Sequence, residues 1–188
     1  MAIKKLFLLA AFIFFAFDSA YAQKTNDAIL KQIKSLKAEK TIELSYDESG
    51  NTSKIMVRSE NFDGKEAGKT GIQAMNFGMA FFYAGTALQT PPETIALTFW
   101  VLTKKPQFAA AHNLVVALGN ETLDLGDARY AARPGESMEY LNFKISRADL
   151  AKIAAGPGAK FRIGTADFTF SPQHLAIFRD LLAISSVN

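Results

Sequence analysis

The sequence contains no cysteine, and this absence limits both its chemistry and the ways in which its fold can be held together. Without thiols the chain can form no disulfide, no thiolate metal site and no cysteine nucleophile. Its stability must therefore come from a hydrophobic core, and a chain of 188 residues is long enough to bury one.

Histidine is almost as scarce, because His112 and His174 are the only two. Two histidines without cysteine disfavour a tight zinc or copper site, and any Ser-His-Asp arrangement would have to use one of them. The pattern places His112 in a loop and His174 in the first turn of a helix, so we expect two ordinary surface histidines. We therefore expect no cofactor and no metal.

An excess of charge of one sign is also missing. The chain has 21 Lys and Arg against 18 Asp and Glu, a net charge of +3. Proteins that bind nucleic acid usually carry a clustered basic surface, so this balance predicts no nucleic-acid partner. A lysine stripe at Lys31, Lys34 and Lys37 follows the spacing of a helix and indicates its solvated face.

The first 22 residues have the features of a secretory signal peptide. Lys4-Lys5 forms a positive n-region before an apolar run from 6 to 17, and Ala20-Tyr21-Ala22 gives the small-x-small pattern that precedes Gln23. At ~1.5 Å per residue that run rises about 18 Å, short of the roughly 30 Å of a bilayer core. A cleaved leader is thus favoured over a membrane anchor, and the absence of cysteine excludes a lipoprotein anchor.

We predict that residues 23–188 form a single exported globular domain, periplasmic or secreted, with a bacterial envelope as the favoured setting. Removal of Lys4, Lys5 and Asp18 with the leader would lower the net charge from +3 to +2. Later apolar runs are interrupted by charges, prolines or glycines, so we expect no membrane span after signal removal.

Alternation of apolar and polar residues dominates the rest of the chain. The segment from Glu93 to Lys104 is apolar on both faces, which predicts a central strand covered on both sides, with Trp100 in the core. Further strands are predicted at 41–46, 53–58, 75–83, 114–118, 121–125, 129–133, 138–145, 160–163 and 167–170, and helices at 26–37, 146–155 and from 172 onward.

This order predicts an α+β fold that is mainly antiparallel β, either a sandwich or one strongly bent sheet. An N-terminal helix, a short inserted helix and a C-terminal helix accompany the strands.

Several stretches resemble functional motifs without satisfying them. Gly64 to Thr70 is one residue shorter than a phosphate-binding loop, and Gly135 to Glu139 lacks the second glycine of a nucleophile elbow. The acids of 121–127 (Glu121, Asp124 and Asp127) match no calcium loop and indicate a solvated hairpin face. The Met and aromatic row from Met75 to Tyr83 is typical of core.

These observations favour an exported, non-catalytic binding or interaction protein whose partner is a protein or small ligand of the cell envelope. One alternative is a carboxylate-dependent hydrolase of envelope polymers, which would need two carboxylates that converge in space. Another is a carrier of an apolar ligand, with the row from Met75 to Tyr83 as the wall of its cavity.

We predict cleavage between Ala22 and Gln23 when the full chain is expressed in a bacterium. The intact mass of the protein recovered from the periplasm or the medium should correspond to a chain that begins at Gln23. Recovery of a chain that retains Met1 in those fractions would contradict the prediction.

Overall fold

The computed structural model describes residues 23–36, 41–59, 62, 71–133, 137–156 and 158–187. In these ranges the protein is α+β, with three antiparallel sheets and three helices, which confirms the predicted fold class. The leader with its cleavage site at Ala22, and the segment from Gly64 to Thr70, lie outside the described residues.

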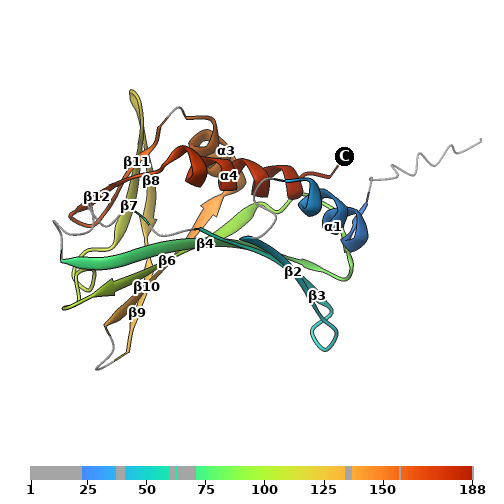
Figure 1. Cartoon of the computed structure of the whole chain (residues 1–188), viewed down its shortest axis with the longest axis horizontal. Helices are drawn as coiled ribbons and strands as arrows, with labels where there is room; N and C mark the ends of the chain where they lie inside the picture. Colours follow the sequence, from blue (N-terminus) through green and yellow to red (C-terminus); the bar gives the residue numbers. More distant parts are fainter. Residues whose placement is uncertain are drawn as a thin grey trace, which may run out of the picture.

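A six-stranded antiparallel sheet forms the base of the molecule (Figure 1), with the strand order β2-β3-β4-β6-β10-β9. The predicted edge strand near residue 129 is confirmed as β9, which pairs with β10 alone. The strands are β2 (Ile42–Asp47), β3 (Thr52–Arg58), β4 (Ile72–Ala84), β6 (Thr94–Thr103), β9 (Arg129–Ala132) and β10 (Met138–Ser146).

A four-stranded antiparallel sheet stands over one end of this base (Figure 1), with the order β12-β11-β7-β8. The hairpin of β7 and β8, at one edge of this sheet, turns through Gly119-Asn120, as predicted, and Gly119 has φ +63°, a conformation that glycine adopts without strain. The strands are β7 (Asn113–Leu118), β8 (Glu121–Asp127), β11 (Lys160–Ile163) and β12 (Ala166–Thr169), and a small third sheet pairs β1 (Lys24–Thr25) with β5 (Ala87–Leu88).

Three capped helices lie on the same side of the six-stranded sheet as the second sheet (Figure 1). They are α1 (Asn26–Ser35), α3 (Arg147–Ala155) and α4 (Pro172–Ile184). Each begins after a hydroxyl residue, and Thr25, Ser146 and Ser171 each accept a hydrogen bond from the backbone N–H three residues on, at 3.3, 2.9 and 3.2 Å. These three caps were predicted from sequence.

Two cations hold the C-terminal end of α4. Lys24 Nζ donates to the carbonyl oxygens of Ala183, Ile184 and Ser186 at 3.2, 2.9 and 3.0 Å. The Arg147 guanidinium donates to Ser186 Oγ at 2.7 Å. Positive groups there complement the free carbonyls and the negative end of the helix dipole, so the beginning of the described chain is fastened to its end.

Phenylalanine rings join the layers. Phe77 of β4 contacts Phe178 of α4 with ring centroids 5.3 Å apart, and Phe99 of β6 stacks on Phe161 of β11 at 5.5 Å. Phe161 also stacks on Phe170, just before α4, at 4.4 Å. All five rings are buried in one continuous cluster, so the two sheets and α4 share a single core.

The prediction that the central strand is covered on both faces is wrong. Ile95, Leu97, Phe99 and Val101 of β6 are buried, but Trp100 and its neighbours on the other face are only half-buried. The helices and the four-stranded sheet all pack on the first face (Figure 1), so Trp100 is not a core residue.

None of the helices in the described ranges combines the length and the apolar character that crossing a bilayer requires.

We predict that α4 is integral to the fold, and that Phe178→Ala lowers the free energy of unfolding by about 3–5 kcal/mol, as aromatic truncations in cores do. Phe178 is fully buried against Phe77 and Phe170. Urea denaturation should show this loss, whereas the exposed Gln173→Ala in the same helix should stay within about 0.5 kcal/mol of the parent. A loss below about 1 kcal/mol for Phe178→Ala would show that α4 is peripheral.

Candidate binding surface

The face of the six-stranded sheet that points away from the helices is the candidate binding surface, and we call it the open face (Figure 1). Because side chains alternate along a strand, every second residue lies on it. By register it includes Glu43, Ser45 and Asp47 of β2, Lys54, Met56 and Arg58 of β3, Ala74, Asn76, Gly78, Ala80 and Phe82 of β4, Ala96, Thr98, Trp100 and Leu102 of β6, Met138, Tyr140, Asn142 and Lys144 of β10, and Arg129 and Ala131 of β9.

Two aromatic residues lie side by side near its middle. Asn76, Trp100 and Tyr140 are direct cross-strand partners on β4, β6 and β10. The indole of Trp100 extends over β4, because a Cβ added at Gly78 would lie 2.4 Å from its Cη2 and 2.8 Å from its Cζ3. Glycine at 78 therefore makes room for the ring. Since Trp100 is only half-buried, part of the indole remains accessible from solvent.

A polar row runs beside the aromatic pair. It crosses five strands in register, from Arg58 through Gly78, Thr98 and Asn142 to Arg129. Within it Thr98 Oγ1 donates to Asn142 Oδ1 at 2.8 Å, and Asn142 Nδ2 donates to the Arg129 carbonyl at 3.3 Å. At ~4.8 Å per strand spacing, about 19 Å separates the two arginine backbones. The row thus has a cation at each end. The Trp100 indole lies over Gly78, and the neutral pair Thr98 and Asn142 lies between that ring and Arg129.

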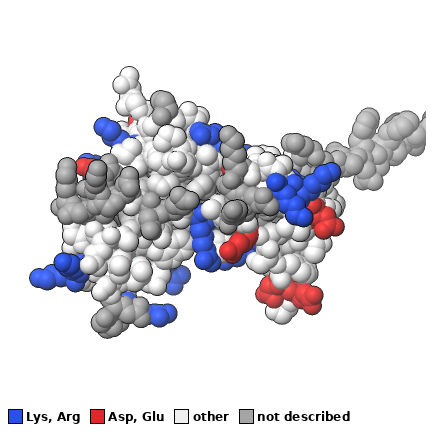
Figure 2. Space-filling model, in the orientation of Figure 1, with Lys and Arg blue, Asp and Glu red and all other residues white. Residues whose placement is uncertain are grey.

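Positive charge predominates on this face away from its β2 edge. The open-face residues of β3, β4, β6, β9 and β10 include Lys54, Arg58, Arg129 and Lys144, and none of them is acidic. In Figure 2 acidic side chains gather at the tip of the β2–β3 hairpin, while Lys and Arg project from the opposite end of the sheet. Lys54 also lies 5.9 Å from the ring centroid of Phe82, which is 58% exposed.

One amide on the open face has hydrogen-bonding capacity that the protein does not use. Asn76 Oδ1 is buried, and no group in the described part of the chain donates to it. A buried acceptor without a donor costs about 1–3 kcal/mol. Nothing in the packing of β4 explains the choice of asparagine opposite Trp100.

Behind the open face, β10 carries a buried acid. Glu139 is 2% exposed and accepts four hydrogen bonds: from Thr103 Oγ1 at 2.9 Å, Gln107 N at 2.8 Å, Phe108 N at 3.0 Å and the Tyr130 hydroxyl at 3.1 Å. Two of the donors belong to the connection from β6 to β7, where the chain passes from one sheet to the other. Glu139 therefore fixes that crossing.

The surroundings of Glu139 also contain a tyrosine and a histidine. Burial, and then the adjacent Glu139 carboxylate, raise the pKa of the Tyr130 hydroxyl above its usual value. His112 stacks on Tyr130 with ring centroids 5.7 Å apart, and its Nδ1 lies 3.0 Å from the Phe108 carbonyl oxygen. Because the four donors engage both Glu139 oxygens and the side chain is covered, this cluster is suited to holding structure rather than to proton transfer.

Sequence reasoning did not single out Glu139 as an anchor, although a signal was present. Leu141, Phe143 and Ile145 are inward-facing as predicted, and Glu139 shares their parity on β10. An acid at an inward position must find hydrogen-bond donors, so the alternation alone pointed to a buried carboxylate.

The prediction of a surface position is wrong for His174. This residue is 6% exposed, with its ring 4.3 Å from that of Phe62. The ring Nδ1 of His174 accepts a hydrogen bond from the backbone N–H of Ser171 at 3.2 Å, and the backbone N–H of His174 donates to Ser171 Oγ. These two hydrogen bonds complete the capping box of α4. The ring serves helix capping and core packing together.

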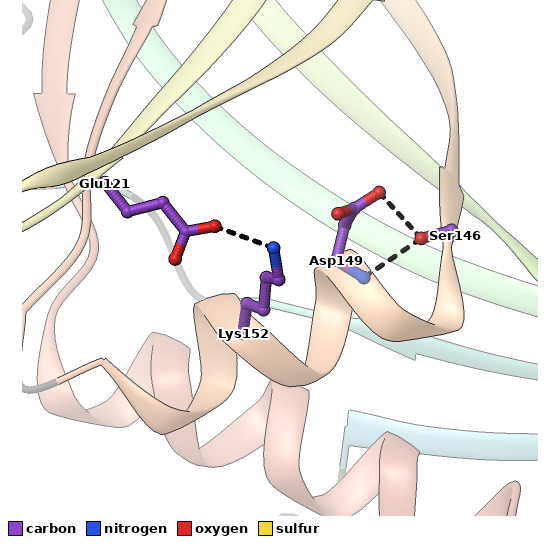
Figure 3. A network of polar contacts seen from close by, with 4 residues as sticks. All are labelled: Glu121, Ser146, Asp149 and Lys152. Carbon is purple, nitrogen blue, oxygen red and sulfur yellow. Dashed lines mark hydrogen bonds and ion pairs between the residues drawn. The ribbon is translucent and has the colours of Figure 1, made fainter.

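The acids of 121–127 lie on the solvated hairpin face that was predicted. Glu121 pairs with Lys152 of α3 at 2.6 Å, with both side chains about half exposed, beside the Ser146–Asp149 cap of that helix (Figure 3). Exposed pairs of this kind contribute about 0–1 kcal/mol. Among the described residues no group of three or more His, Cys, Asp or Glu side chains is placed to hold a metal ion.

The row from Met75 to Tyr83 is core, as predicted, because Met75, Phe77, Met79 and Phe81 are at most 1% exposed. A shallow hollow of about 510 Å³ lies elsewhere, at the four-stranded sheet, and its lining includes Lys160, Arg162 and Asp167. Its charges are mixed in sign, unlike those of the open face.

The chain matches no known protein-family model, no curated protein and no solved structure.

We predict that Glu139→Gln destabilises the fold by at least about 2 kcal/mol, because an amide cannot accept from all four donors and leaves buried N–H groups unpaired. The measurement is urea denaturation of the variant. The exposed Glu43→Gln on β2 is the matched control and should stay within about 0.5 kcal/mol of the parent. Equal stability of the two variants would contradict the anchoring role.

Proposed function

We propose that this is an exported, non-catalytic binding protein of the bacterial envelope, and that the open face is its binding surface. The observation that carries the proposal is the composition of that face. Trp100, Leu102, Met138 and Tyr140 lie together on a side of the sheet opposite the helices and the second sheet. Solvated faces of antiparallel sheets are normally polar, and this half-buried apolar cluster, with polar groups around it, suits a surface that a partner covers.

Export is supported by the first 22 residues, with their positive n-region, apolar run and Ala-Tyr-Ala series before Gln23. The lack of cysteine agrees with a bacterial setting and leaves the fold independent of disulfide formation after export. A ligand of the cell envelope is the kind of partner that such a protein meets.

The hydrolase alternative has weaker support. Glu139 is the buried acid that the fold brings next to a tyrosine and a histidine, but its oxygens are engaged by four donors. Retaining and inverting mechanisms both need a second carboxylate at a set separation, whereas the partners of Glu139 are hydroxyls and backbone amides.

The carrier alternative also has weaker support. Its proposed wall from Met75 to Tyr83 faces the phenylalanine core, and Phe77 makes ring contacts with Phe62, Phe99, Phe170 and Phe178. Side chains of the protein itself occupy the space next to that wall.

The proposal predicts that envelope material shields the open face. Hydroxyl-radical labelling of the protein mixed with solubilised envelope fractions should fall at Trp100, Met138 and Tyr140, relative to the protein alone. Tyr46, which is 40% exposed and lies outside the open face, is the internal control and should label equally in both samples.

Unchanged labelling of Trp100, Met138 and Tyr140 in every fraction would refute binding through the open face. A screen of peptidoglycan, glycan and ester substrates should stay at background. Turnover that Glu139→Gln abolishes in a folded protein would favour the hydrolase instead.

A further inference from the structure

We propose that the ligand of the open face is an acidic polysaccharide, bound across the strands along the two adjacent rows that contain Trp100 and Asn142. This inference rests on the proposed function and specifies its ligand. These rows contain two aromatic residues (Trp100 and Tyr140), the neutral polar side chains of Thr98 and Asn142, and an arginine at each end. The two arginine backbones lie about 19 Å apart, taking ~4.8 Å for each strand spacing.

The aromatic pair suits a sugar ring. Sugars present apolar C–H faces and polar edges, and the indole of Trp100 lies over Gly78 with part of its surface accessible. Tyr140, its cross-strand partner on β10, lies on the side of β6 away from Gly78 and offers a second aromatic ring and a hydroxyl. An aromatic side chain with an apolar ring and one hydrogen-bonding group fits a ligand that has polar, solvated edges and an apolar face.

Neutral polar groups beside the aromatic pair suit a chain rich in hydroxyls. Thr98 and Asn142 are joined by a hydrogen bond and form a fixed polar pair. Asn76 lies on the other flank of Trp100, but its Oδ1 is buried, so Thr98 and Asn142 are the neutral polar side chains offered to a ligand here. Hydroxyls both donate and accept, so a polyol can use amide groups of either polarity.

The charges on the face select an acidic member of this class. Arg58 and Arg129 end the polar row, and Lys144 lies on β10 two residues from Asn142. The open-face residues of β3, β4, β6, β10 and β9 include no acid, whereas Glu43 and Asp47 lie on the β2 edge of the face, beside Met56 and Thr52. A ligand with carboxylate or sulfate groups spaced along it would meet a cation at each end of the row.

The same groups fit a nucleic acid less well. Single-stranded nucleic acid needs a cationic track that follows every phosphate, whereas cations here lie at the two ends of the row and neutral groups fill its centre. The whole chain has a net charge of only +3.

The single tryptophan of the chain reports on this surface directly, because Trp100 lies in its centre. The protein, as recovered from the expressing cell, is titrated with polygalacturonate, alginate and hyaluronate, with neutral dextran, and with a single-stranded oligothymidine. We expect a saturable change in tryptophan emission with at least one acidic polysaccharide, weaker at high salt. Dextran should bind at least about ten-fold more weakly, since it lacks the charged contacts.

Variants locate the site while leaving the fluorophore in place. Tyr140→Ala and Arg129→Gln should each weaken binding of the responsive polysaccharide by roughly ten-fold, as loss of one good contact does. Arg162→Gln, an exposed arginine on β11 of the other sheet, is the matched control and should bind as the parent does. Circular dichroism checks that each variant keeps the parent fold.

The outcomes separate the two proposals. If no acidic polysaccharide changes the emission while envelope fractions still shield Trp100 and Tyr140, the ligand class is wrong and the binding surface stands. If oligothymidine binds as tightly as the best polysaccharide, or if Arg162→Gln weakens binding as much as Arg129→Gln, the inference is overturned. Failure of both the shielding and the titrations refutes both proposals.

Discussion

The meeting of phenylalanine rings from four elements is the interaction on which the rest of the structure depends. Phe77 of β4, Phe99 of β6, Phe161 of β11 and Phe178 of α4 make a chain of ring contacts between 5.3 and 6.1 Å. Each layer contributes a ring, so no layer can be removed without exposing the others. In a chain without cysteine, this shared core takes the place of a covalent link between the sheets.

Packing everything on one side of the six-stranded sheet has a direct consequence for its other side. The core fixes the inward residues, but the open face is constrained only by β propensity and by cross-strand neighbours. Its residues are therefore free to serve a ligand, and Gly78 shows such a specialisation because it lets Trp100 extend across β4. The core and the proposed binding surface thus lie on opposite faces of the same strands.

The connection between the two sheets is held by a buried acid as well as by rings. Glu139 holds Gln107 and Phe108 by their backbone amides at the point where the chain leaves β6 for β7. A carboxylate with four donors is well satisfied, and it needs no cation to neutralise it in order to stay buried. The same strand, β10, presents Tyr140 and Asn142 to the open face, so the anchor and the candidate surface share one rigid element.

Local order was determined by the sequence alone. The helix caps at Thr25, Ser146 and Ser171, the turn at Gly119 and the alternation of β10 depend on neighbouring residues, so local patterns were enough to predict them. The tertiary structure alone decided which faces are covered. Both faces of β6 are apolar in sequence, but only one meets the helices, because the covering elements come from distant parts of the chain. For the same reason Trp100 was placed in the core and His174 on the surface, whereas Trp100 is half-buried on the open face and His174 is buried. A sequence period states which residues share a face, and only long-range packing determines what lies against it.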